Sequence, residues 1–196
     1  MKLCVFQGTF NPIHNGHMSM AAFVRKTYDY NNILFIPAYR PPHKDFDDDM
    51  SNHRYAMVKQ AVGGESFYAI SNIEFQNERF SYTYLTIQEL YKRYKIDGKI
   101  NFVIGSDAFR EIQSWYEANN LKKLVKFKVF AREPHFKPES IDHLAKRGYD
   151  FDVLSMPFDD ISSSEVREKL KDGMPVSRLL PPAVAEYIQK NGLYKD

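Results

Sequence analysis

Two histidines three positions apart, His14 and His17, stand in segment 8–17, directly after a short apolar run. Gly8 predicts a tight turn and a close approach of the backbone to a ligand. Asn15 can cap the helix that follows, which would place backbone N–H groups and the positive end of the helix dipole near His17. Such a helix start suits a polyphosphate. Two unrelated loop histidines and a metal pair are the alternatives, but no third ligand at an obvious spacing accompanies them.

A second candidate phosphate site lies in segment 161–170, which carries three consecutive serines at 162–164. Ser162 and Glu165 predict a capping box, and Gly173 predicts the end of the helix. Capping alone would explain one serine and the glutamate, but not three serines followed by Arg167 in the next turn. Hydroxyls, N–H groups and a guanidinium at one helix start favour a phosphate. Two such helix starts suit a triphosphate held from both sides.

The elements that must position these residues alternate along the chain. Helical patterns include the apolar faces at 55–62 and 84–94 and a helix from Pro182 to a stop at Gly192. This alternation predicts an α/β fold with a mostly parallel sheet, whose ligands bind at the carboxyl ends of the strands. Without repeats or obvious linkers, residues 1–196 are predicted to form a single domain. The predicted strands are the short apolar runs 3–6, 33–36, 67–70, 101–104, 127–130 and 152–154.

Bulk properties exclude several classes of protein. Hydrophobic residues make up 43% and charged residues 27% of the chain, and the net charge is +2. This balance argues against a general nucleic-acid or membrane-surface binder. Cys4, the only cysteine, excludes an intrachain disulfide and is expected to be a small buried thiol. No run approaches the roughly 20 apolar residues of a membrane span, and the N-terminal run is too short for a signal peptide. We expect a cytoplasmic protein.

The two candidate segments resemble the (H/T)xGH and ISSTxxR-type motifs of the adenylyltransferase superfamily. From end to end the chain resembles the bacterial nicotinate-mononucleotide adenylyltransferase family. It departs from that family at Gln7, where a second glycine is common, at Asn11, where aspartate is usual, and at Ser164, where threonine is frequent. Tyr84 and Leu85 stand in a stretch that often carries an aspartate. The supporting segments are 41–44, 81–83, 104–107, 115–116 and 187–194.

The resemblance implies a Rossmann-like, doubly wound fold. It also implies a reaction of ATP with nicotinate mononucleotide that gives nicotinate adenine dinucleotide and pyrophosphate, in NAD biosynthesis. Mg²⁺ would accompany the ATP, with no metal site of the protein's own, and an oligomer is possible. The expected catalytic residues are His14, His17 and Arg167. The expected ATP-binding residues are these three with Gly8, Thr9, Phe10, Gly105, Asp107, Ser162, Ser163 and Ser164.

The expected substrate-binding residues are Lys44, Thr83, Trp115, Tyr116 and Arg132. Lys44, beside two prolines, is a candidate for the substrate phosphate, and Trp115 is expected to stack on the pyridine ring. The backbone N–H groups of Thr83 and Tyr116 would bind the substrate carboxylate.

Each of these assignments has a plainer alternative. An isolated loop lysine such as Lys44 is usually only solvated, Trp115 could be a core residue, and Asp107 could only cap a helix. Pantetheine-phosphate adenylyltransferase is the nearest rival function, but segment 41–44 and the Trp115–Tyr116 pair argue against it. A sensor that binds ATP without turnover is the rival from another class. A Rossmann dehydrogenase is disfavoured, because no GxGxxG follows the first strand.

Overall fold

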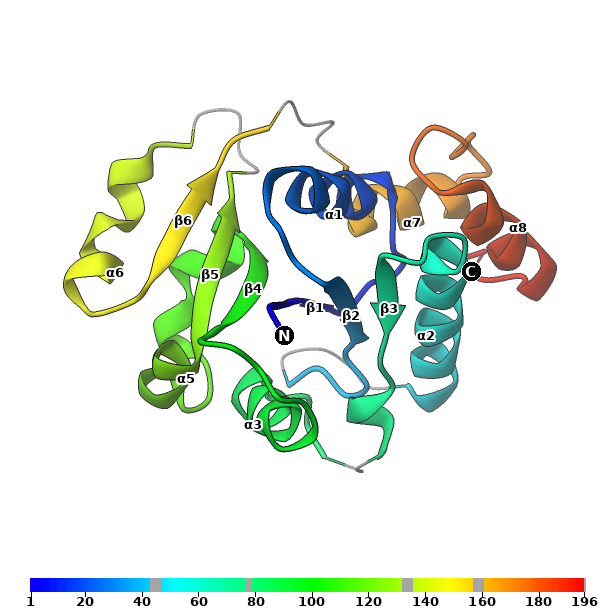
Figure 1. Cartoon of the computed structure of the whole chain (residues 1–196). Helices are drawn as coiled ribbons and strands as arrows, with labels where there is room; N and C mark the ends of the chain where they lie inside the picture. The colour runs from blue at the N-terminus through cyan, green and yellow to red at the C-terminus, as the bar shows by residue number, and fades with distance from the viewer. Residues whose placement is uncertain (43–46, 77–78, 132–135, 157–160, 196) are drawn as a thin grey trace.

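The centre of the protein is a six-stranded parallel sheet in the order β3-β2-β1-β4-β5-β6 (Figure 1). The computed structural model describes residues 1–42, 47–76, 79–131, 136–156 and 161–195. All six predicted strands are present, and the predicted doubly wound α/β fold is confirmed. The strands are β1 Leu3–Gly8, β2 Asn32–Pro37, β3 Tyr68–Ile70, β4 Ile100–Gly105, β5 Val125–Phe130 and β6 Phe151–Leu154.

Helices cover both faces of the sheet. No helix in the described ranges has the length and apolarity that a membrane crossing would require. The α-helices are α1 Asn15–Thr27, α2 Asp48–Val62, α3 Thr83–Arg93, α4 Ser106–Arg110, α5 Ala118–Leu124, α6 Asp142–Lys146, α7 Ser163–Lys171 and α8 Pro182–Asn191. Short 3₁₀ turns are η1 Ile73–Gln76, η2 Ile112–Ser114 and η3 Pro138–Ile141.

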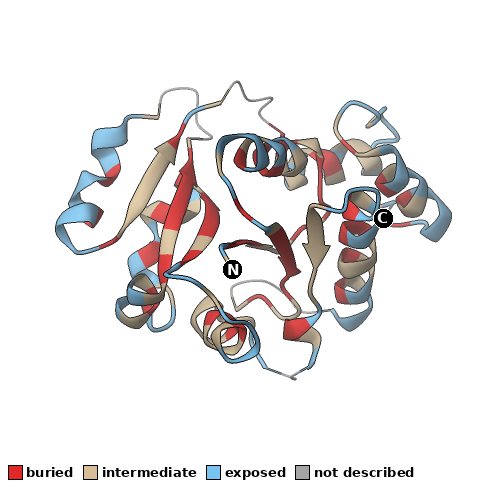
Figure 2. Ribbon diagram, in the orientation of Figure 1, coloured by how far each residue is buried: buried red, intermediate tan, exposed pale blue. Residues whose placement is uncertain are grey.

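The strands separate two hydrophobic cores, because successive side chains point to opposite faces. In β1, Cys4 and Phe6 join the core under α1, α2, α7 and α8. Leu3 and Val5 join the core under α3, α5 and α6. The central strands are therefore apolar on both faces, while the edge strands β3 and β6 are only partly buried (Figure 2). Cys4 is fully buried as expected, and burial raises the pKa of its thiol well above the ordinary value.

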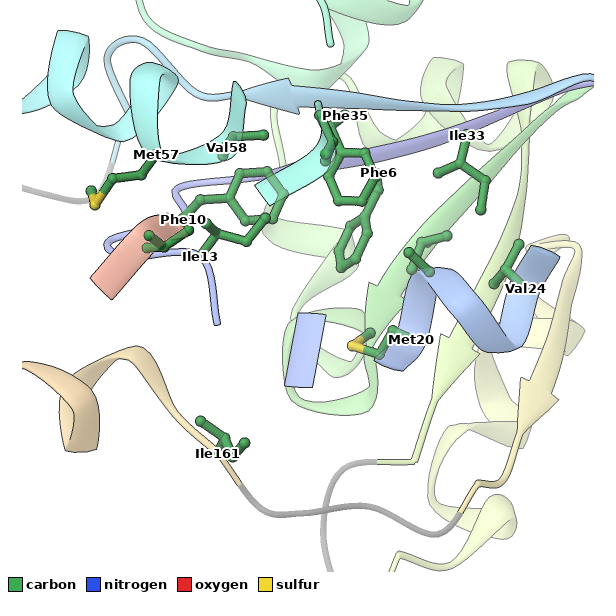
Figure 3. Close-up of a cluster of buried hydrophobic side chains, with 14 of the residues drawn as sticks. Phe6, Phe10, Ile13, Met20, Val24, Ile33, Phe35, Met57, Val58 and Ile161 are labelled. Atoms are coloured by element: carbon green, nitrogen blue, oxygen red, sulfur yellow. The ribbon is translucent and has the colours of Figure 1, made fainter. Parts of the chain in front are cut away.

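The first core also anchors the two candidate phosphate segments. Phe10 and Ile13 after β1, and Ile161 before α7, belong to the same cluster as Phe6 and Met20 (Figure 3). All five side chains are at most 5% exposed. The loop that follows β1 and the start of α7 are thus held against a common apolar surface, although about 150 residues separate them in the chain.

The predicted start of α8 and the predicted ends of α7 and α8 are confirmed. α8 begins at Pro182 and ends before Gly192, whose φ of 63° places it in the left-handed region. α7 ends before Gly173, whose φ is 66°. The N–H groups of Gly173 and Met174 then return to the carbonyl groups of Leu170 and Lys169. These turns direct the last residues of the chain back across the first core.

Candidate active site

A cavity of about 840 Å³ opens at the carboxyl ends of β1 and β4. Among the described residues, β1 and β4 pair only at positions 4–5 and 101–102, so both strands continue toward the cavity without bonding to each other. Strand order reverses at this pair, since β2 and β3 lie on one side of β1, and β4 to β6 lie on the other. Ligands of doubly wound sheets bind at this position.

Every predicted site residue in the described part of the chain lines this cavity. Lys44 and Arg132 lie outside the described residues. The residues that the cavity brings together are Gly8, Thr9, Phe10, His14, His17, Thr83, Gly105, Asp107, Trp115, Tyr116, Ser162, Ser163, Ser164 and Arg167. They come from both ends of the sequence and from both sides of the sheet, so the fold gathers them at one place.

The two histidines form a stacked pair at the start of α1. Their ring centroids are 3.7 Å apart with the planes inclined by 29°. The backbone N–H of His14 donates to Nδ1 of His17 over 3.2 Å. Because Nδ1 accepts this bond, the proton of a neutral His17 ring is on Nε2. His17 is therefore fixed in the tautomer that can donate from Nε2 to a ligand.

The prediction that Asn15 caps α1 is wrong, because His14 is the capping residue. Asn15 is instead tied to the C-terminal part of the chain: its N–H donates to the carbonyl of Leu179, and its Nδ2 donates to the carbonyl of Arg178. The ring of His17 then takes the role of the capping acceptor. The helix still presents its N-terminus to the cavity, so the predicted dipole argument is unaffected.

Gly16, between the two histidines, and Gly8, at the end of β1, each lie against an aromatic ring. A Cβ on Gly16 would stand 3.1 Å from the ring of His14. A Cβ on Gly8 would stand 3.1 Å from the ring of Phe10. The predicted tight turn at Gly8 is wrong, since Gly8 is the last residue of β1 and pairs with Pro37. The positive φ, 50°, occurs at Phe10, whose buried ring holds it there.

The serine segment bonds to the loop that follows β1. Ser162 caps α7 by accepting from the N–H of Glu165 over 3.1 Å. The hydroxyl of Ser163 donates to the carbonyl of Pro12 over 3.0 Å. The two hydroxyls are therefore engaged in holding the protein together. The first N–H groups of the helix, on Ser163 and Ser164, have no acceptor within the helix and are placed for an anion.

Arg167 joins the same two segments. Its guanidinium donates to the carbonyl of Asn11 over 2.8 Å and to the hydroxyl of Ser164 over 3.2 Å. The side-chain oxygen of Asn11 accepts a further hydrogen bond, 2.6 Å long, from the hydroxyl of Tyr194. Asn11 is thus held by α7 and by the last residues of the chain, and burial raises the pKa of the Tyr194 hydroxyl above its ordinary value.

On the α3 side, aromatic rings border the cavity. Tyr116 is 48% exposed and stacks on Tyr82, with ring centroids 4.6 Å apart. Trp115 is half-buried, with its ring edge-on to Phe102, and it also faces the cavity. It is therefore neither a fully buried core residue nor a free surface ring. Thr83 is the first residue of α3, as predicted, so its N–H lies at the positive end of that helix.

Two buried charged residues, Arg54 and Glu74, support the cavity and were not predicted. Arg54 is 3% exposed and donates to the carbonyl groups of Thr9, Ala38 and Tyr39. Burial lowers the pKa of its guanidinium, and burial raises the pKa of the Glu74 carboxyl. Their sequence signal is weak, because neither stands in a motif that marks a buried charge.

The cavity is better supplied with donors than with metal ligands. Within the described ranges, no group of three or more His, Cys, Asp or Glu residues could hold a metal ion. Asp107 lies in the first turn of α4 and lines the cavity. The imidazoles, guanidinium and helix N-termini suit phosphate oxygens.

Known proteins share this fold and this sequence pattern. Residues 5–169 match the family model described as Cytidylyltransferase-like. A protein of Desulfitobacterium hafniense (strain Y51), named a probable nicotinate-nucleotide adenylyltransferase, is 36% identical over 200 residues, which cover 99% of this chain and 96% of that protein. A protein of Caldicellulosiruptor saccharolyticus with the same name is 34% identical over 202 residues and matches over the whole of both chains.

Solved structures support the fold at lower identity. A structure of the Plasmodium falciparum nicotinic acid mononucleotide adenylyltransferase complexed with NaAD has a TM-score of 0.78 and 23% identity. The match covers 98% of this chain and 97% of that one. With the family model and the full-length relatives, these findings show that the chain belongs to the nicotinate-nucleotide adenylyltransferase family, within the cytidylyltransferase-like proteins.

Proposed function

We propose that this protein joins ATP and nicotinate mononucleotide to give nicotinate adenine dinucleotide and pyrophosphate, as a step of NAD biosynthesis. The observation that carries this proposal is a single cavity into which the N-termini of α1, α7 and α3 all open, beside an aromatic pair. The first two helix starts suit a triphosphate, and the third suits the carboxylate of a pyridine ring. The names of the full-length relatives agree with this assignment.

The reaction needs no nucleophile from the protein. An oxygen of the 5′-phosphate of nicotinate mononucleotide attacks the α-phosphorus of ATP. The bond from that phosphorus to the oxygen bridging it to the β-phosphate breaks in line, and pyrophosphate leaves. Catalysis then consists of positioning the two substrates and stabilising the charge that develops on the phosphate oxygens.

The donors around the first helix start are assigned to the triphosphate. His17, with its proton on Nε2, donates to an oxygen that gains charge in the transition state. His14, whose ring is stacked against that of His17, is assigned to the triphosphate as well. Arg167 and the N–H groups of Ser163 and Ser164 approach from α7. Gly8, Thr9 and Phe10 line the loop side, while Gly105 and Asp107 are assigned to the adenosine ribose.

The α3 side of the cavity is assigned to the acceptor nucleotide. Trp115 stacks on the pyridine ring, and the N–H groups of Thr83 and Tyr116 bind its carboxylate. A carboxylate accepts from both donors, whereas the amide of nicotinamide presents an NH₂ group to at least one of them. Lys44 and Arg132 remain assigned to the substrate phosphate and the nucleotide from the sequence.

Mg²⁺ is proposed to enter with ATP. The donor-rich lining fits a cation held mainly by phosphate oxygens and water, as Mg²⁺ prefers, rather than by a set of protein carboxylates. Bound in this way, Mg²⁺ would supply positive charge to the triphosphate and to the leaving pyrophosphate. Arg167 and the helix N-termini supply the remaining positive potential.

Pyrophosphate release separates this function from its rivals. The purified protein is given ATP-Mg and, in separate reactions, nicotinate mononucleotide, nicotinamide mononucleotide or phosphopantetheine. We expect turnover with the first. Turnover with phosphopantetheine alone would favour the pantetheine-phosphate reaction. ATP binding without pyrophosphate release from any acceptor would favour the sensor.

A further inference from the structure

Among the described residues, Glu74 is the buried acidic residue, and its carboxyl group bonds to segments that line the cavity. The proposed mechanism does not use it. It lies in η1, between β3 and α3, and is only 7% exposed. A carboxyl group in such a place is costly unless its oxygen atoms accept hydrogen bonds. Its partners therefore indicate what the group is placed to do.

The partners come from three separate segments. The amide Nε2 of Gln7, at the end of β1, donates to Oε1 of Glu74. The hydroxyl of Thr86, in the first turns of α3, donates to the same oxygen over 2.7 Å. The backbone N–H of Tyr39, just beyond β2, donates to Oε2 over 3.3 Å. One carboxyl group thus joins the ends of two strands to the start of a helix.

These segments form one side of the cavity. Gln7 lines it directly, and Thr86 lies one helical turn after Thr83, whose N–H is assigned to the substrate carboxylate. The loop beyond β2 is tied to the segment before α3 as well. Ser81 donates its N–H to the carbonyl of Arg40 over 2.8 Å, and its hydroxyl accepts from the N–H of Arg40 over 3.0 Å.

The first turn of α3 bonds in a way that leaves its N-terminus to a ligand. The N–H groups of Leu85 and Thr86 both donate to the carbonyl of Tyr82. Those of Thr83 and Tyr84, the first two of the helix, have no acceptor inside it. Because Glu74 bonds to the Thr86 side chain, it anchors the helix without occupying these N–H groups.

We propose that Glu74 is a positioning residue for the acceptor nucleotide: it fixes the N-terminus of α3 against the ends of β1 and β2, so that the Thr83 N–H meets the pyridine carboxylate. Gln7 takes part in this role, since its side chain connects β1 to Glu74. In a chain with glycine at position 7 this bond would be absent. The inference rests on the proposed function and assigns a specificity-determining role to a residue that does not touch the substrate.

The test separates the two substrates. Glu74→Gln preserves the size of the side chain but replaces one acceptor oxygen by an NH₂ group. That group would face the N–H and O–H donors that now bond to the carboxyl. We expect the KM for nicotinate mononucleotide to rise about tenfold or more, because a buried donor that loses its acceptor is costly. The KM for ATP should change less than threefold, because the ATP donors lie on α1 and α7.

Three further variants, one of them a double variant, separate positioning from general destabilisation. Thr86→Val removes only the hydroxyl that donates to Glu74, and should raise the same KM by a smaller factor. Combined with Glu74→Gln it should add less than its single effect, because the bond is already lost. Glu89→Gln is the matched control further along α3, where Glu89 is partly exposed and pairs with Lys92 and Arg93, and it should leave both KM values unchanged.

A purely structural role for Glu74 would give a different pattern. Thermal unfolding would shift, but below the unfolding temperature both KM values of Glu74→Gln and Thr86→Val would match the wild type. That result overturns the inference, as does an equal rise in both KM values. If the wild type itself fails to use nicotinate mononucleotide, the proposed function fails, and the two failures are therefore distinguishable.

Discussion

Replacing His17 by alanine should remove one hydrogen bond that the structure contains and one that we propose to a ligand, and the two losses have different consequences. On one side of the ring, Nδ1 accepts from the N–H of His14 at the start of α1. Losing that capping acceptor should cost about 1 kcal/mol of folding stability. On the other side, Nε2 is assigned as a preorganised donor to the triphosphate. Losing such a donor costs about 2.7–4 kcal/mol in the transition state, which corresponds to a fall in kcat of about 100- to 1,000-fold.

A second variant, His17→Asn, separates the two effects. The amide oxygen of asparagine can stand near the position of Nδ1 and accept from His14, but the shorter side chain places no donor at Nε2. His17→Asn should therefore retain more stability than His17→Ala and still lose kcat. The assay is initial-rate pyrophosphate release with ATP-Mg and nicotinate mononucleotide, with thermal unfolding measured in parallel.

The outcome of this pair can refute the reasoning. If His17→Asn and His17→Ala both keep a near-normal kcat and show only a raised KM for ATP, His17 is a ground-state contact. If kcat follows the stability of each variant instead, the histidine acts through the helix start alone. The account requires kcat to fall in both variants, with stability falling mainly in one.

Three further predictions concern packing, specificity and pH. Gly16→Ala puts a Cβ 3.1 Å from the His14 ring, so kcat should fall about tenfold. Gly64→Ala is the control, because a Cβ there meets no atom within 4 Å, and it should leave kcat unchanged. Equal kcat values in the two variants would contradict the role of close packing at Gly16. The value of kcat/KM should favour nicotinate over nicotinamide mononucleotide by roughly tenfold or more, since each unpaired donor costs about 1–3 kcal/mol. A ratio within about threefold would refute the binding of the carboxylate by two N–H donors. Unchanged pyridine affinity in Trp115→Ala would refute the stacking role of Trp115. Burial raises the pKa of the Glu74 carboxyl above its ordinary value of about 4.3. The contribution of this group to folding stability is therefore full below that ordinary value and is lost as pH rises through the pKa of the folded state. Melting curves should show the wild type losing stability relative to Glu74→Gln over that range, and a pH-independent difference would disprove this.

The strands and the positions of the two candidate phosphate segments could be predicted because their signals are local. Six short apolar runs bounded by polar turns leave few alternatives for a chain of this length. In the serine segment, Ser162 and Gly173 predict the start and the end of a helix, and α7 begins just after the first and ends before the second. The parallel sheet then fixes where the carboxyl ends of β1 and β4 meet, and the predicted cavity residues that the structure describes follow from that.

What could not be predicted depends on residues distant in the sequence. Asn15 is the better capping residue by local preference, yet a bond to Leu179, more than 160 positions away, moves the cap to His14. Gly8 appeared to allow a turn, but the constraint is the ring of Phe10 packed against it. Glu74 has no distinguishing neighbours in the sequence, because its hydrogen-bond partners come together only when β1, β2 and α3 assemble.

The proposed adenylyl transfer can be measured as pyrophosphate release from wild-type protein with ATP-Mg and nicotinate mononucleotide, followed by identification of the product. We expect one pyrophosphate for each nicotinate adenine dinucleotide formed, and no release when the acceptor is omitted. The proposed transfer is contradicted if ATP binds but neither product appears with this acceptor.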